Sequence, residues 1–286
     1  MLRLIFAGTV AIALFAAALP TATGAAGPKR IVSLYLCADE LLLQLADRSA
    51  IASVTFLSRD PDNSNVADLA VRVPVNYGRA EEIIAQRPDL VVAGAYTTGA
   101  TVAMLKRAGV PVVELGVAQG LDDVRRDIRT VAHAIGEDDR GEALIAAVDA
   151  RLAALAASPP RPRLRALVLN PNGFTIGAGS LVDEIFARAG FDNVAATLGV
   201  DAYGQLPLER IVRSDADVLI LNADRDGPPS LATQSLNHPA LRKLAGRVRL
   251  VVLPARLWTC GGPGIVEAIE RLRRVADQAH LAGVPQ

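Results

Sequence analysis

Residues 137–162 read EDDRGEALIAAVDARLAALAASPPRP, a long alanine-rich stretch in the middle of the chain. Its apolar residues recur at steps of three and four, which places them on one face of a helix: Leu144, Val148, Leu152 and Leu155. The SPPRP segment (158–162) ends that helix, because proline cannot continue one. We therefore predict one long helix, residues 137–158, that links two halves of the chain.

Short apolar runs alternate with helical patterns on both sides of this stretch. Before it, the predicted strands are 31–34, 51–54, 90–93 and 110–115, and the segment 58–70 is read as a loop. After it, the predicted strands are 164–169, 218–221 and 248–253. Strands of four to six residues that alternate with helices indicate βαβ units and parallel sheets. The sequence therefore predicts an α/β protein with an N-terminal lobe (27–136) and a C-terminal lobe (159–286).

The composition excludes several classes of protein. Of the 286 residues, 51% are hydrophobic, which excludes a disordered chain. Lys and Arg together number 30, as do Asp and Glu, so the basic excess of a nucleic-acid binder is absent. Aromatic residues make up only 4%, so aliphatic side chains must build the core.

Residues 1–26 have the features of a secretory signal. Arg3 precedes an apolar run (4–19), and a proline and small residues follow it. The run is short for a membrane anchor, which is the alternative interpretation. No cysteine follows the run, so we do not expect a lipoprotein signal. We expect cleavage after Ala25 or Ala26 and an exported, soluble protein.

The few aromatic residues are concentrated after predicted strands or in loops near them. Three come from each half of the chain: Tyr35, Tyr77, Tyr96, Phe174, Tyr203 and Trp258. Parallel sheets bind ligands beyond the carboxyl ends of their strands, and aromatic faces provide large contact areas. Each tyrosine taken singly is equally explained by a polar tip that prefers water. Together the six predict a cleft for a flat, partly apolar ligand, with Phe56, Phe186 and Phe191 left for packing or loops.

Common catalytic motifs are absent from the sequence. It contains no phosphate-binding loop, no nucleophile elbow and no HExxH zinc motif. The three histidines lack metal-ligand spacing, so we assign no catalytic residue and no metal ligand. The nearest candidates for a catalytic acid pair are Asp39 with Glu40 and Asp183 with Glu184.

Segments along most of the chain resemble the periplasmic substrate-binding proteins of ABC importers for cobalamin, haem and ferric siderophores. The N-terminal segments are PKRIVSLYLCADELLLQL (28–45), YGRAEEIIAQRPDLVVAG (77–94) and LKRAGVPVVEL (105–115). The C-terminal segments are GSLVDEIFARAGFDNVAA (179–196), AYGQLPLERIVRSDADVLIL (202–221) and NHPALRKL (237–244). The resemblance implies two Rossmann-like lobes joined by one helix, a ligand cleft between them, and small hinge motion.

The resemblance also implies a function without chemistry of its own. It implies a monomeric periplasmic receptor that captures a metal chelate, a cobalt corrinoid or an iron chelate, and has no cofactor of its own. Tyr203 falls where a cobalamin-binding member has a cleft tryptophan, and Tyr77 and Tyr96 fall near other cleft aromatics. Haem remains an alternative because tyrosine can be an axial ligand. Siderophores remain another, with Arg59, Arg79 and Arg256 as candidate cations. An exported enzyme or a sensor on the same architecture is the third alternative.

Two glutamates are implied to contact the membrane permease. In the family, one glutamate from each lobe docks onto arginines of the permease, and the matching positions here are Glu81 and Glu209. Carboxylate–arginine pairs are bidentate and therefore fix orientation. Glu82 is an equally plausible neighbour, and acidic residues also favour the first turn of any helix.

The chain contains two cysteines, Cys37 and Cys260, which follow strands of opposite lobes. Three interpretations remain open for them in an oxidising compartment. They form a disulfide that tethers the lobes, they are two buried small side chains, or they contact a metal chelate as thiols.

Overall fold

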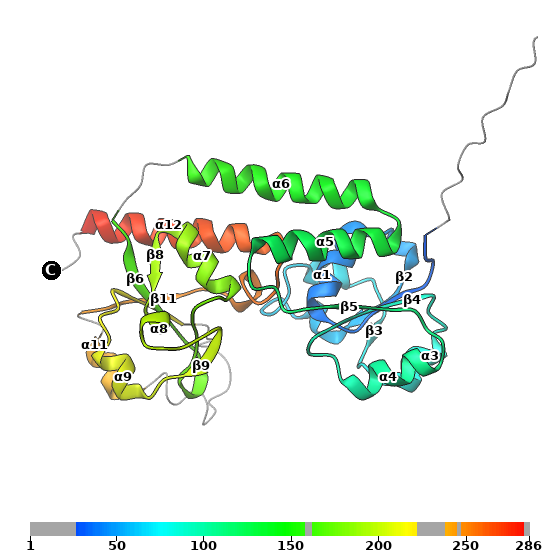
Figure 1. The fold of residues 1–286 in the computed structure, drawn as a ribbon, viewed down its shortest axis with the longest axis horizontal. Helices are drawn as coiled ribbons and strands as arrows, with labels where there is room; N and C mark the ends of the chain where they lie inside the picture. The colour runs from blue at the N-terminus through cyan, green and yellow to red at the C-terminus, as the bar shows by residue number, and fades with distance from the viewer. Residues whose placement is uncertain (1–26, 158–161, 222–237, 245–246, 283–286) are drawn as a thin grey trace, which may run out of the picture.

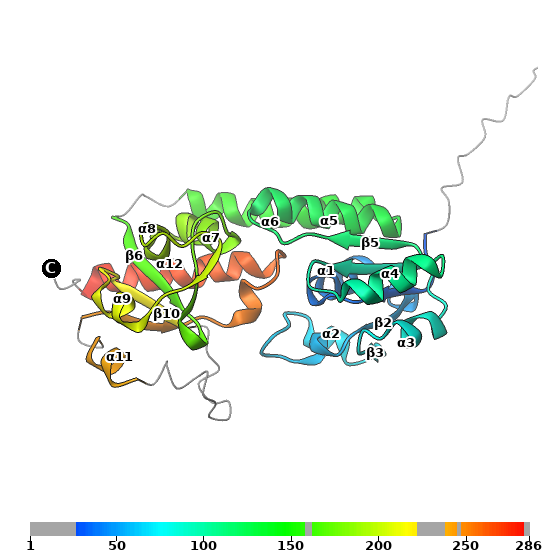
Figure 2. The ribbon, with the colours of Figure 1, turned by 60° about the horizontal axis from the view of Figure 1, so that its bottom comes forward.

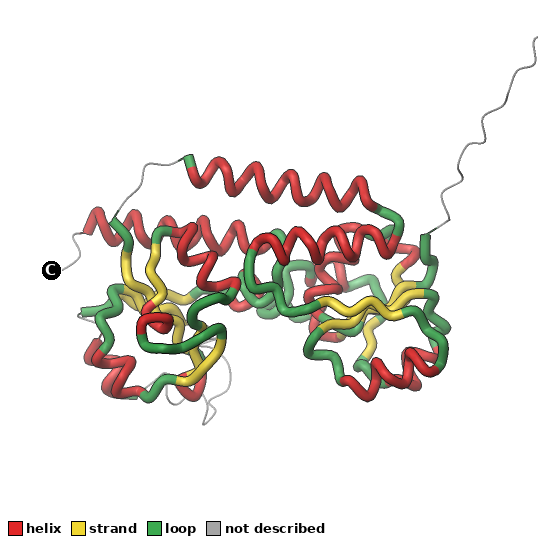
Figure 3. Tube along the Cα trace, in the orientation of Figure 1, coloured by secondary structure: helices red, strands yellow, loops and turns green. Residues whose placement is uncertain are grey.

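The computed structural model describes residues 27–157, 162–221, 238–244 and 247–282. Two α/β lobes lie side by side, and long helices run along one side of the molecule (Figure 1). The strands gather in two separate groups, one in each lobe (Figure 3). The α/β fold with two lobes predicted from the sequence is confirmed. The predicted signal segment lies outside the described residues.

The N-terminal lobe is built on a parallel sheet of five strands. Along the sheet the order is β3 (Val75–Asn76), β2 (Ile51–Thr55), β1 (Ile31–Ser33), β4 (Leu90–Gly94) and β5 (Val112–Leu115). Successive side chains of a strand point to opposite faces. Val92 thus packs in one cluster with α1 (Leu36–Leu45) and α5 (Leu121–Ile135), whereas Val91 packs with α3 (Ala80–Ala85) and α4 (Gly99–Arg107). The central strands are therefore apolar on both faces.

Short elements in this lobe were missed from the sequence. The segment read as a loop (58–70) contains the helical turn α2 (Ala67–Ala70) and overlaps a second turn, η2 (Phe56–Arg59), and β3 follows shortly after. A further turn, η1 (Arg48–Ala50), precedes β2. Elements of two to four residues are too short to show a hydrophobic period.

The C-terminal lobe has a parallel sheet and a separate pair of antiparallel strands. The sheet order is β11 (Arg249–Val252), β10 (Val218–Leu221), β6 (Leu164–Leu169) and β8 (Phe191–Asn193). The antiparallel pair consists of β7 (Phe174–Ile176) and β9 (Tyr203–Gln205). The turn η3 (Pro171–Gly173) directly precedes β7. The helices are α7 (Leu181–Ala189), α8 (Val194–Thr197), α9 (Leu208–Arg213), α11 (Pro239–Leu244) and α12 (Gly264–Ala282). The sequence did not predict β7, β8, β9 or α8.

The long middle helix, α6 (Asp138–Ala156), extends from one lobe to the other (Figures 1 and 2). Its buried residues are Gly141, Ile145, Val148 and Leu152, and Leu144 and Leu155 are only half-buried. A side chain at Gly141 would meet the Cβ of Ala132 at 2.5 Å, so glycine lets α6 pack closely against α5. The buried stripe is therefore centred slightly to one side of the predicted one.

A second connection joins the lobes through the segment 255–263, which we call the crossing segment. It comprises η5 (Ala255–Leu257) and the loop before α12, and it reaches from the C-terminal lobe to the N-terminal lobe (Figure 1). Arg256 donates a hydrogen bond to Asn65 Oδ1 at 3.0 Å, and Asn65 Nδ2 donates to the carbonyl of Arg256 at 2.5 Å. Asn65 also donates its backbone N–H to Glu40 at 2.9 Å. The crossing segment is thus fixed to the N-terminal lobe.

A third contact between the lobes lies at the start of α5. The carboxylate of Glu184, on α7, accepts a hydrogen bond from the N–H of Leu121 at 2.6 Å. This satisfies one of the free N–H groups at a helix N-terminus. A side chain at Gly120 would come within 2.7 Å of the same carboxylate, so glycine permits the close approach.

Candidate ligand-binding cleft

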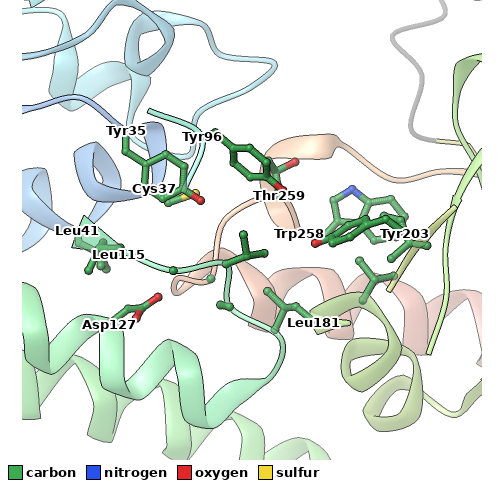
Figure 4. Close-up of a pocket in the computed structure, with 16 residues that line it drawn as sticks. Tyr35, Cys37, Leu41, Tyr96, Leu115, Asp127, Leu181, Tyr203, Trp258 and Thr259 are labelled. Carbon is green, nitrogen blue, oxygen red and sulfur yellow. The ribbon is translucent and has the colours of Figure 1, made fainter. Parts of the chain in front are cut away.

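A cavity of about 170 Å³ lies between the two lobes and is lined by both of them (Figure 4). From the N-terminal lobe, Tyr35 follows β1, Tyr96 follows β4, and residues 116–118 follow β5. The C-terminal lobe contributes Leu181, Tyr203 and Trp258, among others. The cavity therefore opens at the carboxyl edge of the N-terminal sheet, where parallel sheets bind ligands.

Four of the six predicted ligand-binding aromatics line this cavity: Tyr35, Tyr96, Tyr203 and Trp258. The rings of Tyr35 and Tyr96 lie 6.5 Å apart between centroids. Trp258 is only 4% exposed and packs against Phe186 at 6.4 Å, so it belongs to the core as well as to the cavity wall. Tyr96 is 71% exposed and Tyr203 is 48% exposed, which leaves both rings accessible at the rim.

The other two predicted aromatics lie outside the cavity lining. Phe174 stacks on Tyr203, with centroids 6.2 Å apart and planes 14° apart, and so extends the aromatic rim. Tyr77 stacks on Phe56 at 5.4 Å, and both rings are exposed on the N-terminal lobe. Sequence reasoning left Phe56 for packing or loops, but its position directly after β2 also places it at a strand end.

The cavity contains phenols and one carboxyl group, and burial raises the pKa values of Tyr35 and Asp127. Burial, followed by the nearby Tyr96, Asp127 and Tyr203, raises the pKa of Tyr35 to about 12, so its phenol stays protonated at neutral pH. Burial also raises the pKa of the Asp127 carboxyl. Among the residues recorded as lining the cavity, none is a lysine, arginine or histidine.

The candidate siderophore-binding arginines are directed elsewhere. Arg59 donates to the carbonyls of Ala70 and Val73, and Arg256 donates to Asn65. Arg79 is exposed at the N-terminus of α3. None of the three is among the residues that line the cavity.

Cys37 and Cys260 form a disulfide at the edge of the cavity, with their Cα atoms 5.1 Å apart. Cys37 lies in α1, and Cys260 lies in the crossing segment, so the bond joins the two lobes. A disulfide leaves no thiol free to contact a metal chelate. Of the three interpretations of the two cysteines, the structure confirms the disulfide that tethers the lobes.

The two carboxylate pairs considered for catalysis are engaged within the fold. Asp39 accepts hydrogen bonds from the N–H and the hydroxyl of Thr55, and Glu40 accepts from Asn65. Asp183 accepts from Asn193, and Glu184 caps α5. None of the four is among the residues that line the cavity, and each has a structural role.

Asp39 is expected to make folding stability depend on pH. Burial raises its pKa from 3.8 to about 7, so the folded protein holds a proton that the unfolded chain releases. This stabilisation is complete below about pH 4 and is lost as the pH rises through 7, at up to about 1.4 kcal/mol per pH unit. In urea unfolding from pH 4 to 8, Asp39→Asn should flatten this slope.

The exposed Asp62→Asn variant is the control for that experiment and should keep the wild-type slope. Equal slopes for Asp39→Asn and the wild type would show that Asp39 does not hold the proton.

The two predicted docking glutamates are both exposed. Glu81 lies in α3 of the N-terminal lobe, and Glu209 lies in α9 of the C-terminal lobe. Both helices are on the side of the molecule away from α6 (Figure 1). Neighbouring Glu82 accepts a hydrogen bond from the N–H of Tyr77 at 3.0 Å, so it is occupied within its own lobe.

The described residues contain no group of three or more His, Cys, Asp or Glu side chains that could hold a metal ion. In the same part of the chain, no helix is long and apolar enough to cross a membrane.

Two α/β lobes, a bridging helix and an aromatic cleft between the lobes define a two-lobed solute-binding protein. The chain belongs to the periplasmic binding protein family, whose model matches residues 31–244. It is 27% identical over 205 residues to a cobalamin-binding protein of Halobacterium salinarum, covering 70% of this chain and 55% of the relative. The chain thus spans about half the length of that relative.

Solved structures have the same architecture. A periplasmic haem-binding protein from Roseiflexus sp. RS-1, in its apo form, is 27% identical with a TM-score of 0.72, covering 88% of this chain and 99% of that chain. The periplasmic vitamin B12-binding protein of Vibrio cholerae is 19% identical with a TM-score of 0.68, covering 89% and 98%. At 19% identity, the similarity to the vitamin B12-binding protein shows a shared fold alone.

Proposed function

We propose that this protein captures a cobalamin-type corrinoid in the cleft and delivers it to the permease of an ABC importer. The observation that carries the proposal is the chemical character of the cavity. Its recorded lining consists of aromatic and aliphatic side chains, small polar groups and one buried carboxylate, without a cation. A corrinoid is flat and carries neutral amides at its edge, so its faces suit aromatic contact.

A corrinoid is larger than the cavity and would extend from it onto the rim. Sites for small organic ligands usually measure roughly 300 to 1,000 Å³, and this cavity measures about 170 Å³. The stacked pair Phe174 and Tyr203, together with Tyr96, continues the aromatic surface at the rim. A corrinoid that enters the cavity would rest its outer part on these rings.

Haem is the second candidate ligand, favoured by the tyrosines and by the similarity to a haem-binding protein. One observation weighs against it. Haem carries two propionates, and no lysine, arginine or histidine among the described lining residues is available to pair with them.

Titration of the purified protein with dicyanocobinamide, cyanocobalamin, haemin and a ferric siderophore tests the assignment. We expect both corrinoids to bind more tightly than haemin and the ferric siderophore, as measured by absorbance and by calorimetry. Tighter binding of haemin than of either corrinoid would contradict the proposal, and so would the absence of corrinoid binding.

Replacing Tyr203 by alanine is expected to weaken corrinoid binding by about tenfold or more, because a large stacking surface is lost. The thermal stability should change little, because the ring is 48% exposed. Tyr203→Phe keeps the ring and should retain most of the affinity. Equal corrinoid affinities of the alanine variant and the wild type would show that Tyr203 does not contribute to ligand binding. Trp258 is less suited to this test, since its burial makes truncation destabilising.

The remaining parts of the proposal follow from this role. We infer export through residues 1–26, a periplasmic monomer without a resident cofactor, and permease docking through Glu81 and Glu209. Residues 27–136 and 159–286 act as the two lobes, and 137–158 as the linking helix. A sensor without a permease would bind the same ligand but would tolerate loss of both glutamates.

A further inference from the structure

An acidic residue, Asp127, interrupts the apolar face of helix α5. The buried residues of that helix follow the helical period, with Val124, Ile128 and Val131 on the face that meets the core. Asp127 falls on the same face and is only 8% exposed. Its carboxylate points into the cleft, below Tyr35 and opposite Leu181 (Figure 4).

Asp127 has little compensation from its surroundings. Among the described residues, the one cation recorded within ion-pair distance is Arg126, whose Nη2 lies 3.7 Å from Oδ1. Arg126 itself is exposed and makes a shorter contact of 2.6 Å with Asp123. Within the same residues, no hydrogen bond to the Asp127 side chain is recorded. The Asp127 oxygens are not among the fully enclosed unpartnered atoms, so water in the cleft reaches them. A ligand that displaces this water must supply hydrogen-bond donors in its place.

No other polar side chain recorded in the cavity lining donates a hydrogen bond to Asp127, so a bound ligand would have to provide the donor. The phenol of Tyr35 is close enough to be influenced by the Asp127 charge, and it remains protonated. The remaining polar side chains of the lining are the hydroxyls of Tyr96, Tyr203 and Thr259. Asp127 is therefore the one acidic residue among the described residues that line the cavity.

We propose that Asp127 is a specificity-determining residue, whose carboxylate selects ligands that present N–H donors at their buried edge and disfavours ligands that present carboxylates. This rests on the proposed corrinoid function and narrows it. A side-chain amide of a corrinoid has two N–H donors, whereas a propionate has only acceptors. A hydrogen bond to a charged group contributes about 1.5–3 kcal/mol, or roughly 10- to 150-fold in affinity.

The test compares two corrinoids that differ at their edges. Dicyanocobinamide carries amides, and dicyanocobyrinic acid carries carboxylates at the same positions. We expect the wild type to bind the amide form more tightly. In Asp127→Asn the amide form should lose roughly tenfold in affinity and the acid form should gain, so the preference shrinks. A merely structural defect would weaken both ligands together.

Asp122→Asn is the matched control, since it removes one charge from the same helix at a fully exposed side chain. It should keep the wild-type preference. An unchanged preference in Asp127→Asn would overturn the role of Asp127 but leave the corrinoid assignment standing. Equal binding of both corrinoids by the wild type would overturn it without any variant. Failure of the wild type to bind either corrinoid would overturn the proposed function and this inference together.

Discussion

Replacing Cys37 and Cys260 by serine is expected to lower the free energy of unfolding by about 4–5 kcal/mol. The disulfide joins residues 223 positions apart, so it restricts a very large loop in the unfolded chain. Because it also joins the two lobes, its loss removes a tether beside the cleft. Urea unfolding of the oxidised wild type and the double serine variant, at equal protein concentration, measures the difference.

Reductant provides an internal control for this prediction. Reduced wild type should approach the stability of the serine variant, and the variant itself should not respond to reductant. Alkylation of two thiols in unreduced, unfolded protein would contradict the tether. So would a stability difference below about 1 kcal/mol, given the size of the loop.

Simultaneous replacement of Glu81 and Glu209 by alanine is expected to abolish corrinoid uptake through the importer. Each exposed carboxylate would lose a bidentate partner on the permease, and an orienting contact would be lost from both lobes. Ligand affinity should stay within about twofold of the wild type, because neither residue lines the cavity. Uptake into cells or vesicles that contain the cognate importer, together with equilibrium titration, measures both quantities.

The control for docking is Asp139→Ala with Glu142→Ala on helix α6, on the other side of the molecule. It removes two exposed carboxylates and should leave uptake intact. Unaltered uptake by the Glu81 and Glu209 variant would favour a sensor or another docking surface. Reduced ligand affinity would indicate that the glutamates act on the cleft instead.

The fold was largely predictable because its longer elements carry readable patterns. The length of α6 and the continuous apolar runs of β4, β6 and β10 are visible in the sequence, and the parallel sheets follow from the alternation of strands with helices. The missed strands β3, β7, β8 and β9 have two or three residues each. Such segments pair because the surrounding fold places them, and no local pattern encodes this.

The candidate site was predictable only in part. Tyr35 and Tyr96 were correctly predicted to line the cavity, because their positions directly after strands can be recognised from the local sequence. It could not show that Trp258 is mostly buried against Phe186, which depends on packing between distant segments. Asp127 was missed, although an acidic residue on the apolar face of an amphipathic helix was a readable signal.

The crossing segment has a consequence for the order of folding. Asn65 and Arg256 bond to each other across 191 positions, so the N-terminal lobe lacks these partners until nearly the whole chain is present. Until then the side chain of Asn65 lacks both of its hydrogen bonds to Arg256. Contacts between residues so far apart in the sequence slow folding. Docking of the crossing segment is therefore expected to be the step that completes both lobes.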